Sequence, residues 1–310
     1  MAISPQAFAA FKAHLARTVV GQNQTINALL VALLTGGHVI LEGVPGTAKT
    51  LLVKQIALGL QAQFRRVQLT PDVLPADILG THIFDLNSRT FTLKQGPIFT
   101  EILLADEINR TPPKTQAALL EAMEERQVTL DGETLALSPL FWVIATQNPL
   151  EFEGTYPLPE AQLDRFLFKV VVNYPAVEAE KQMLLNLGNA PQDHEPPLLT
   201  VAMILAAQQA ARRVKVADAV VDYLLTLVGR SRQTRDLALG ASPRAAVAWF
   251  RASQAYAWLG GRDFVTPDDV KAIAPDLLRH RLILSPDALL DGVTVDTVIQ
   301  GLLNAVPVPR

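Results

Sequence analysis

Short apolar runs alternate with amphipathic segments along the first half of the chain. Apolar residues at helical spacing predict helices over residues 8–17, 22–34 and 50–60. Brief apolar runs typical of strands occur at residues 38–41, 64–69, 102–104 and 141–145. Buried strands separated by helices form parallel sheets that are covered on both faces. This part of the chain is therefore expected to be an α/β layer structure.

Two segments follow the alternating pattern of β-hairpins instead. Residues 81–93 alternate around a polar Asn87-Ser88 pair. Residues 128–137 alternate around Asp131-Gly132, a pair that suits a two-residue turn in which both residues have positive φ. Two β-hairpins are therefore expected as insertions into the α/β core.

The strand pattern stops after Tyr174-Pro175. Residues 189–197 are rich in proline and polar side chains and indicate a connector. The later helices are expected at residues 200–213, 218–232 and 243–259, with one more starting at Thr266-Pro267. We therefore expect an α/β core over residues 1–188 and a small all-helical domain over residues 189–310.

Composition excludes several classes of protein. The 310-residue chain has no cysteine, which rules out disulfide frameworks, thiolate metal sites and cysteine nucleophiles. Its net charge of -3 argues against a surface that coats nucleic acid. Although 49% of the residues are apolar, no run approaches the roughly 18 residues of a membrane span, and no signal peptide is visible. A cytoplasmic protein whose excess apolar surface forms subunit contacts is expected.

The strongest chemical signal is the glycine-rich segment at residues 43–50, which follows a strand and opens a helix, as a phosphate-binding loop does. Lys49 is expected to reach the β- and γ-phosphates of ATP, and the Thr50 hydroxyl to bind Mg²⁺. Ala48 replaces the last glycine of the usual pattern, which is tolerable if its φ is negative. The expected nucleotide contacts are Gly43, Val44, Pro45, Gly46, Thr47, Ala48, Lys49, Thr50 and Leu51.

Two other strands end in polar residues. Asp106 and Glu107 follow the strand at 102–104, where Asp106 would hold Mg²⁺ directly or through water and Glu107 would polarise the attacking water. Carboxylates that only cap a helix are the alternative. Asn148 follows the strand at 141–145 and could orient that water, but a turn-forming Asn-Pro pair explains it equally well.

Two arginines have open interpretations. A guanidinium at Arg165 suits the transition-state charge of a transferring phosphoryl group, but a surface salt bridge to Asp164 or Glu160 explains the residue type better. Arg244 starts a helix in the second domain and could reach a nucleotide, or could equally pack over an aromatic ring.

Together, in this order, these motifs resemble the MoxR family of AAA+ ATPases. The resemblance is carried by residues 43–50, 106–110, 112–123, 145–149, 153–166 and 240–244. It implies an AAA+ P-loop core with two inserted hairpins and a helical lid. It also implies a trans-acting arginine finger at Arg165, sensor 1 at Asn148, sensor 2 at Arg244, and an entry to the adenine pocket at Val20-Gly21. Whether Arg110 and Arg244 act in cis or in trans stays open.

The resemblance further implies ATP hydrolysis with Mg²⁺ in a ring, expected to be a homo-hexamer. The family is understood as chaperone-like, assisting maturation or cofactor insertion of a client, often beside a partner with a von Willebrand factor A domain. The two hairpins are expected to face the ring pore. The alternatives are a nucleotide-gated binding module with little hydrolysis, a magnesium-chelatase-like subunit, and a nucleic-acid translocase, which the net negative charge disfavours.

Overall fold

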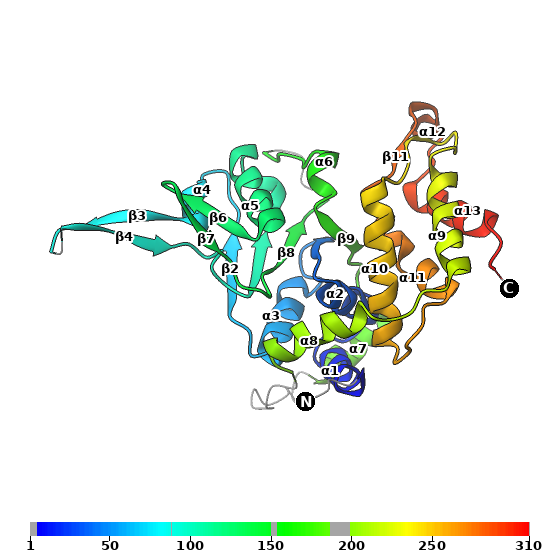
Figure 1. Cartoon of the computed structure of the whole chain (residues 1–310), viewed down its shortest axis with the longest axis horizontal. Helices are drawn as coiled ribbons and strands as arrows, with labels where there is room; N and C mark the ends of the chain where they lie inside the picture. Colours follow the sequence, from blue (N-terminus) through cyan, green and yellow to red (C-terminus); the bar gives the residue numbers. More distant parts are fainter. Residues whose placement is uncertain (1–4, 88, 150–153, 187–198, 310) are drawn as a thin grey trace.

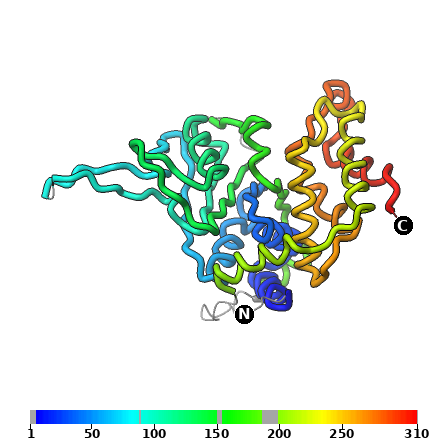
Figure 2. Tube along the Cα trace, viewed as in Figure 1, coloured from blue at the N-terminus to red at the C-terminus, as the bar shows by residue number. Residues whose placement is uncertain are grey.

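The computed structural model describes residues 5–87, 89–149, 154–186 and 199–309. The expected connector at 189–197 and the expected domain boundary at 188/189 lie outside these ranges, so the boundary stays a prediction. Figures 1 and 2 show an elongated molecule with a projecting hairpin at one end and a helical lid at the other.

The centre of the molecule is a five-stranded parallel sheet with the order β2-β5-β8-β1-β9. The strands are β1 (His38–Glu42), β2 (Phe64–Gln68), β5 (Ile102–Asp106), β8 (Trp142–Gln147) and β9 (Phe166–Val171). Four of these were expected from the apolar runs, and β9 was not singled out. Glu42 pairs with Gln147 and Val171 at one edge, here called the carboxyl edge. His38 pairs with Phe166 at the opposite edge, here called the amino edge.

Helices cover both faces of the sheet because alternate side chains of each strand point to opposite sides. On one face, Val39 and Leu41 of β1 share a core with three helices. On the other face, Ile40 packs into the core that contains Leu119 and Leu120. The covering helices are α1 (Pro5–Thr18), α2 (Asn23–Thr35) and α3 (Lys49–Gly59) on the first face, and α5 (Pro113–Glu125) on the second.

Both expected hairpins are confirmed. One is β3 (Gly80–Asp85) with β4 (Thr90–Gln95), which follows the short helix α4 (Pro75–Leu79), and the other is β6 (Gln127–Leu130) with β7 (Glu133–Ala136). In the second hairpin, Asp131 and Gly132 have φ values of 49° and 88°, as the expected turn requires. The β3–β4 hairpin extends well beyond the sheet (Figure 1).

The C-terminal part is helical, as expected, with one addition. Leu237–Leu239 (β10) and Ile283–Leu284 (β11) form a small antiparallel pair that is too short to leave an alternating pattern in the sequence. The helices are α8 (Val201–Ala211), α9 (Asp218–Ser231), α10 (Pro243–Leu259), α11 (Pro267–Leu278), α12 (Pro286–Leu290) and α13 (Val295–Ala305). The short helices η1 (Ile108–Arg110) and α6 (Glu160–Leu163), and the helix α7 (Val177–Asn186), belong to the preceding part of the chain.

The lid is fixed to the core by shared apolar packing. Leu29 and Leu33 of α2 belong to the same buried cluster as Ile204 of α8, Trp249 of α10 and Ile273 of α11. The indole N–H of Trp249 is satisfied by the carbonyl of Val270, 2.8 Å away. A continuous core of this kind holds the first residues of α10 in one place relative to the sheet.

Candidate active site

The phosphate-binding loop leaves β1 at the carboxyl edge and leads into α3. The Gly43 N–H donates to the carbonyl of Gln147, 3.2 Å away. A side chain at Gly43 would collide with the backbone carbonyl of Val172, so a glycine is required where the loop passes β9. Gly46 has a φ of 86°, and the space around its Cα is open. The loop is thus anchored at its start and accessible at its centre.

The backbone at Ala48 does not meet the condition under which alanine would be tolerable. Ala48 has φ 60° and ψ 19°, in the left-handed region, and stands at the N-cap of α3. The φ is therefore not negative, and the loop keeps the conformation that glycine usually supplies. A Cβ in this region costs about 1 kcal/mol or slightly more. This strained residue directly precedes Lys49.

Lys49 folds back over the loop. Its Nζ donates to the carbonyls of Gly43 at 2.6 Å and Val44 at 2.7 Å. Burial lowers the pKa of Lys49, and the nearby charges of Asp106 and Glu107 oppose that shift. The ammonium group therefore lies inside the loop, where phosphate oxygens would replace the two carbonyls as its acceptors.

The loop opens onto a cavity of about 370 Å³ at the carboxyl edge. Its lining brings together most of the residues expected at the nucleotide: Gly43, Pro45, Gly46, Thr47, Ala48, Lys49, Thr50, Leu51, Asp106, Glu107 and Asn148. Thr146 and Gln147, which were not among the expected residues, complete the lining. Asn148 is 8% exposed there. Val44 contributes its carbonyl to Lys49 rather than a surface to this lining.

Val20 and Gly21 lie apart from that lining. Gly21 has a φ of 84°, and a Cβ built on it would lie 2.8 Å from the Pro175 Cβ and 3.0 Å from the Ala179 Cβ. The neighbouring Gln22 donates to the carbonyl of Asn173 at 3.0 Å. The segment is thus packed against the chain that leaves β9, and its role at the adenine stays a prediction.

Asp106 is held by two groups that the sequence did not point to. Its Oδ1 accepts a short hydrogen bond from the Thr146 hydroxyl. Its Oδ2 accepts from Arg66 Nη2 at 2.6 Å and Nε at 3.0 Å. Asp106 as a whole is 8% exposed, and its carboxylate faces the cavity. Arg66 therefore occupies the oxygen at which a divalent cation would compete.

Glu107 is set apart by its backbone. It has φ 59° and ψ 52°, and its N–H donates to the Thr146 hydroxyl at 2.9 Å. Its Oε2 accepts from Gln68 Nε2 at 2.7 Å and lies 3.4 Å from Arg110 Nε of the same chain. The carboxylate thus faces Gln68 and Arg110 instead of capping η1. Strained residues of this kind cluster at functional sites.

Arg165 and Arg244 lie together at the other edge of the sheet. Arg165 directly precedes Phe166, which pairs with the first residue of β1, whereas the loop follows the last. Five residues of strand, about 16 Å, separate these ends. Arg165 Nε donates to Glu124 Oε2 at 2.7 Å, so its partner is not the expected Asp164 or Glu160. Arg244 Nη1 lies 3.2 Å from the other oxygen of Glu124.

The residues at the carboxyl edge fit a magnesium nucleotide. The loop offers an open backbone at Gly46, an ammonium group at Lys49, the Thr50 hydroxyl and a carboxylate at Asp106, all around one cavity. Magnesium in such sites takes only one or two protein ligands, with phosphates and waters completing the octahedron. Accordingly, within the described ranges no group of three or more histidine, aspartate or glutamate side chains forms a dedicated metal cage.

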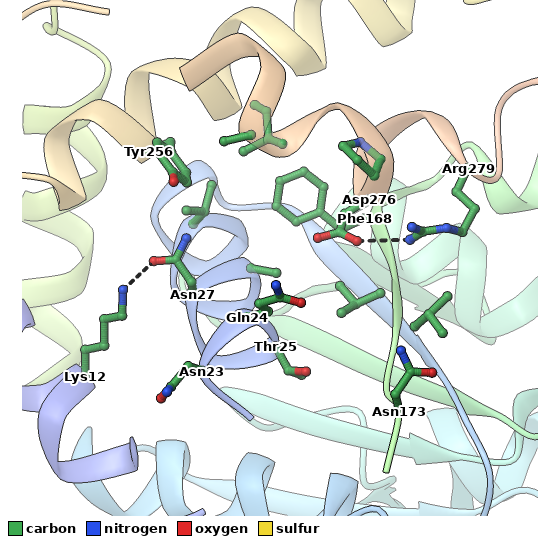
Figure 3. A pocket seen from close by; sticks show the side chains of 17 residues that line it. Lys12, Asn23, Gln24, Thr25, Asn27, Phe168, Asn173, Tyr256, Asp276 and Arg279 are labelled. Atoms are coloured by element: carbon green, nitrogen blue, oxygen red, sulfur yellow. Dashed lines mark hydrogen bonds and ion pairs between the residues drawn. The ribbon is translucent and has the colours of Figure 1, made fainter. Parts of the chain in front are cut away.

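A larger cavity, of about 520 Å³, lies between α2, β9 and the lid helices α10 and α11 (Figure 3). Lys12 donates to Asn27 Oδ1 at 2.8 Å on one side of it, and Arg279 donates to Asp276 Oδ1 at 3.0 Å on the other. Burial raises the pKa of Asp276. None of the motif residues lines this cavity, so size alone does not identify the reactive site.

Comparison with known proteins is consistent from end to end. A family model described as the ATPase family associated with various cellular activities (AAA) matches residues 38–168, and an AAA lid domain matches residues 229–302. The chaperone MoxR1 of Mycobacterium tuberculosis is 45% identical over 303 residues, which cover 95% of this chain and 80% of that protein. The protein MoxR of Methylorubrum extorquens is 30% identical over 98% of this chain and 95% of its own length.

Two further relatives extend the comparison. The uncharacterized protein YeaC of Bacillus subtilis is 45% identical over 297 residues, 96% of this chain and 93% of that protein. The crystal structure of a candidate ATPase from Cytophaga hutchinsonii superposes with a TM-score of 0.91 at 38% identity, and the match covers 99% of this chain and 96% of that one. In the part of the chain that the structure describes, no helix is both long and apolar enough to cross a membrane.

Proposed function

The chain belongs to the MoxR family of AAA+ ATPases, and on that premise we propose that it is an ATP hydrolase whose active site is completed by a second copy in a ring. The observation that carries the proposal is the division of charged residues between the two edges of the sheet. Lys49, Asp106 and Glu107 line a cavity at the carboxyl edge, whereas Arg165 lies at the amino edge.

At the carboxyl edge, each residue has a distinct task. The loop N–H groups and Lys49 bind the phosphates, and Thr50 and Asp106 would hold Mg²⁺. When bound, that ion would neutralise charge on the β- and γ-phosphates. Glu107, oriented by Gln68 and by the Thr146 hydroxyl, accepts a hydrogen bond from the attacking water and polarises it. Asn148 lines the same cavity and orients that water against the γ-phosphate.

At the amino edge, Arg165 serves the nucleotide of a neighbouring copy. A side chain about 16 Å of strand away from its own loop is badly placed for its own γ-phosphate. An arginine supplied by a neighbour contributes roughly 10³ to 10⁵ in rate by spreading transition-state charge. Arg244 shares the partner of Arg165. We therefore propose that Arg244 acts at the same neighbouring site, in trans.

The proposed output is remodelling of a client protein. The β3–β4 hairpin projects from the core (Figures 1 and 2). It carries exposed apolar side chains. Phe84 is 46% exposed and Phe91 71%, and their ring centroids are 5.2 Å apart. Exposed aromatic clusters on a soluble protein are typical of interaction sites. We further propose that the copies form a homo-hexameric ring with this hairpin at its pore. A partner with a von Willebrand factor A domain would act beside the ring.

Steady-state ATP hydrolysis across a range of protein concentrations tests the proposal, with Glu107→Gln measured alongside. A specific activity that rises with concentration and vanishes in the variant is expected, because assembly brings Arg165 to the neighbouring site. Activity that is absent at every concentration, with ATP binding retained, would instead favour the nucleotide-gated module. Activity that survives Glu107→Gln would contradict the assigned role of Glu107.

A further inference from the structure

Glu124 lies in the last turn of α5 and contacts both arginines at the amino edge. Its Oε2 accepts from Arg165 Nε at 2.7 Å, and its Oε1 lies 3.2 Å from Arg244 Nη1. Arg165 belongs to the core, immediately before β9, and Arg244 is the second residue of α10 in the lid. One carboxylate therefore joins a core arginine to a lid arginine, one on each oxygen.

A second carboxylate fixes the other side of Arg244. Asp164 Oδ2 lies 3.7 Å from Arg244 Nε, and its Oδ1 accepts from Arg281 Nε at 2.7 Å. Arg281 is buried and also donates to the carbonyls of Phe166 and Leu167. The buried guanidinium group of Arg281 thus holds Asp164 in place and restricts the movement of the cluster.

The cluster keeps a positive charge after these pairings. Its three guanidinium groups and two carboxylates leave a net charge of +1. The Arg165 and Arg244 side chains are 30% and 53% exposed. The contact of Arg165 with Glu124 uses the Nε–H and leaves the terminal N–H groups for a second, planar or tetrahedral anion. A phosphate approaching this surface would meet two guanidinium groups held side by side.

We propose that Glu124 is a positioning residue, which holds Arg165 and Arg244 as one unit for insertion into the ATP site of a neighbouring copy. This inference rests on the proposed trans role of Arg165. Two guanidinium groups repel each other, and a carboxylate between them offsets that repulsion while restricting both rotamers. Hydrogen bonding to Arg165 lowers the pKa of Glu124, so the carboxylate stays charged throughout the neutral range.

The test is Glu124→Ala in the full-length protein, with kcat and KM for ATP measured at a concentration at which the assembled form is verified by light scattering. We expect kcat to fall between about tenfold and a hundredfold, the loss that a small misplacement of a catalytic group causes. The KM for ATP and the assembled state should not change. Glu125→Ala, one residue away at the end of the same helix, is the matched control and should behave as wild type.

A double-mutant cycle separates positioning from a structural role. If Glu124 acts through Arg165, Glu124→Ala should cause little further loss in an Arg165→Ala background. Additive losses would overturn the proposal, and so would an unchanged or increased kcat of Glu124→Ala. Glu124→Gln, which keeps the shape and one acceptor, serves if the alanine variant unfolds, and it should lose less activity. If Arg165→Ala itself retains wild-type activity, the proposed function fails first, and the two failures are distinguishable.

Discussion

The two edges of the central sheet are built on different principles. At the carboxyl edge, the ends of neighbouring strands bring Asp106, Glu107 and Asn148 beside the loop that follows β1, around one cavity. At the amino edge, Glu124, Arg165 and Arg244 come from a helix end, a strand start and the lid, and ion pairs join them at the surface. The first edge forms a cavity lined by polar and charged residues, whereas the second presents paired charges at the surface.

The difference is also electrostatic. Two carboxylates, Asp106 and Glu107, lie at the carboxyl edge beside Lys49 and Arg66, so anion and cation sites adjoin there. At the amino edge, guanidinium groups outnumber carboxylates. The phosphates of a bound nucleotide would give the carboxyl edge the negative charge that complements this excess, and complementary potentials fix the register of an interface. The comparison therefore favours an assembly in which the amino edge of one copy meets the carboxyl edge of the next.

The largest expected effect is at the amino edge. Arg165→Ala should reduce kcat by roughly 10³- to 10⁵-fold, because the transition state loses its neighbouring guanidinium. Binding of a fluorescent ATP analogue should be retained, since the loop and Lys49 are intact. Arg213→Ala, a surface arginine of the lid, is the control. An Arg165→Ala protein with wild-type kcat would leave the amino edge without a catalytic role.

The next effect is at the carboxyl edge. Glu107→Gln should reduce phosphate release by roughly 10²- to 10⁴-fold, the usual contribution of a general base. The amide keeps the size of the side chain and leaves Lys49 in place, so nucleotide binding should be retained. Phosphate release and nucleotide binding, measured on the same preparation, separate a loss of hydrolysis from a loss of nucleotide affinity. A parallel loss of binding would mean that Glu107 only supports the loop.

A smaller effect concerns Arg66, whose guanidinium group already contacts Asp106. Arg66→Ala should tighten Mn²⁺ binding in the presence of ADP by up to about fivefold, since the exposed ion pair that competes for Oδ2 contributes about 0.2 to 1 kcal/mol. The Arg66 side chain is 49% exposed, so solvent screens the pair. Electron paramagnetic resonance of bound Mn²⁺ provides a readout independent of turnover. Arg65→Ala, its neighbour on β2, is the control, and weaker Mn²⁺ binding in Arg66→Ala would refute the competition.

The smallest effect is on stability. Ala48→Gly should raise the free energy of unfolding by up to about 1 kcal/mol. Removal of the Cβ relieves the strain of the left-handed conformation, and this gain exceeds the opposing gain in entropy of the unfolded chain. Ala117→Gly, at an exposed helical position of α5, should instead lower it by about 1 kcal/mol. Urea unfolding of the two variants makes the comparison. Equal destabilisation by both would mean that the φ of Ala48 carries no strain.

The carboxyl edge could be predicted from the sequence and the amino edge largely could not. The loop from Gly43 to Thr50 and the carboxylates after β5 follow directly from strand ends, which parallel topology brings to one edge. The turn at Asp131-Gly132 was equally readable, because its side-chain types match its backbone. Such features depend on a few consecutive residues.

The features that sequence reasoning missed depend on long-range contacts. Glu124 meets Arg165 across 41 positions of the chain, and in the sequence it is one of several charged residues at the end of a helix. Arg66 and Gln68 occupy exposed positions of the edge strand β2, and only the register with β5 brings them to Asp106 and Glu107. Gln68 is the last residue of β2, and this position before a loop was the available signal for it. The positive φ at Ala48 could not be predicted, because side-chain type alone does not report a strained backbone.

The most direct test of the shared site mixes two inactive proteins. Arg165→Ala subunits keep Glu107, and Glu107→Gln subunits keep Arg165, so an interface between the two contains one intact site. We expect activity to appear on mixing and to be greatest near equal proportions, although each variant alone is inactive. A mixture as inactive as its components, under conditions in which both are shown to co-assemble, would contradict an active site shared between neighbouring copies.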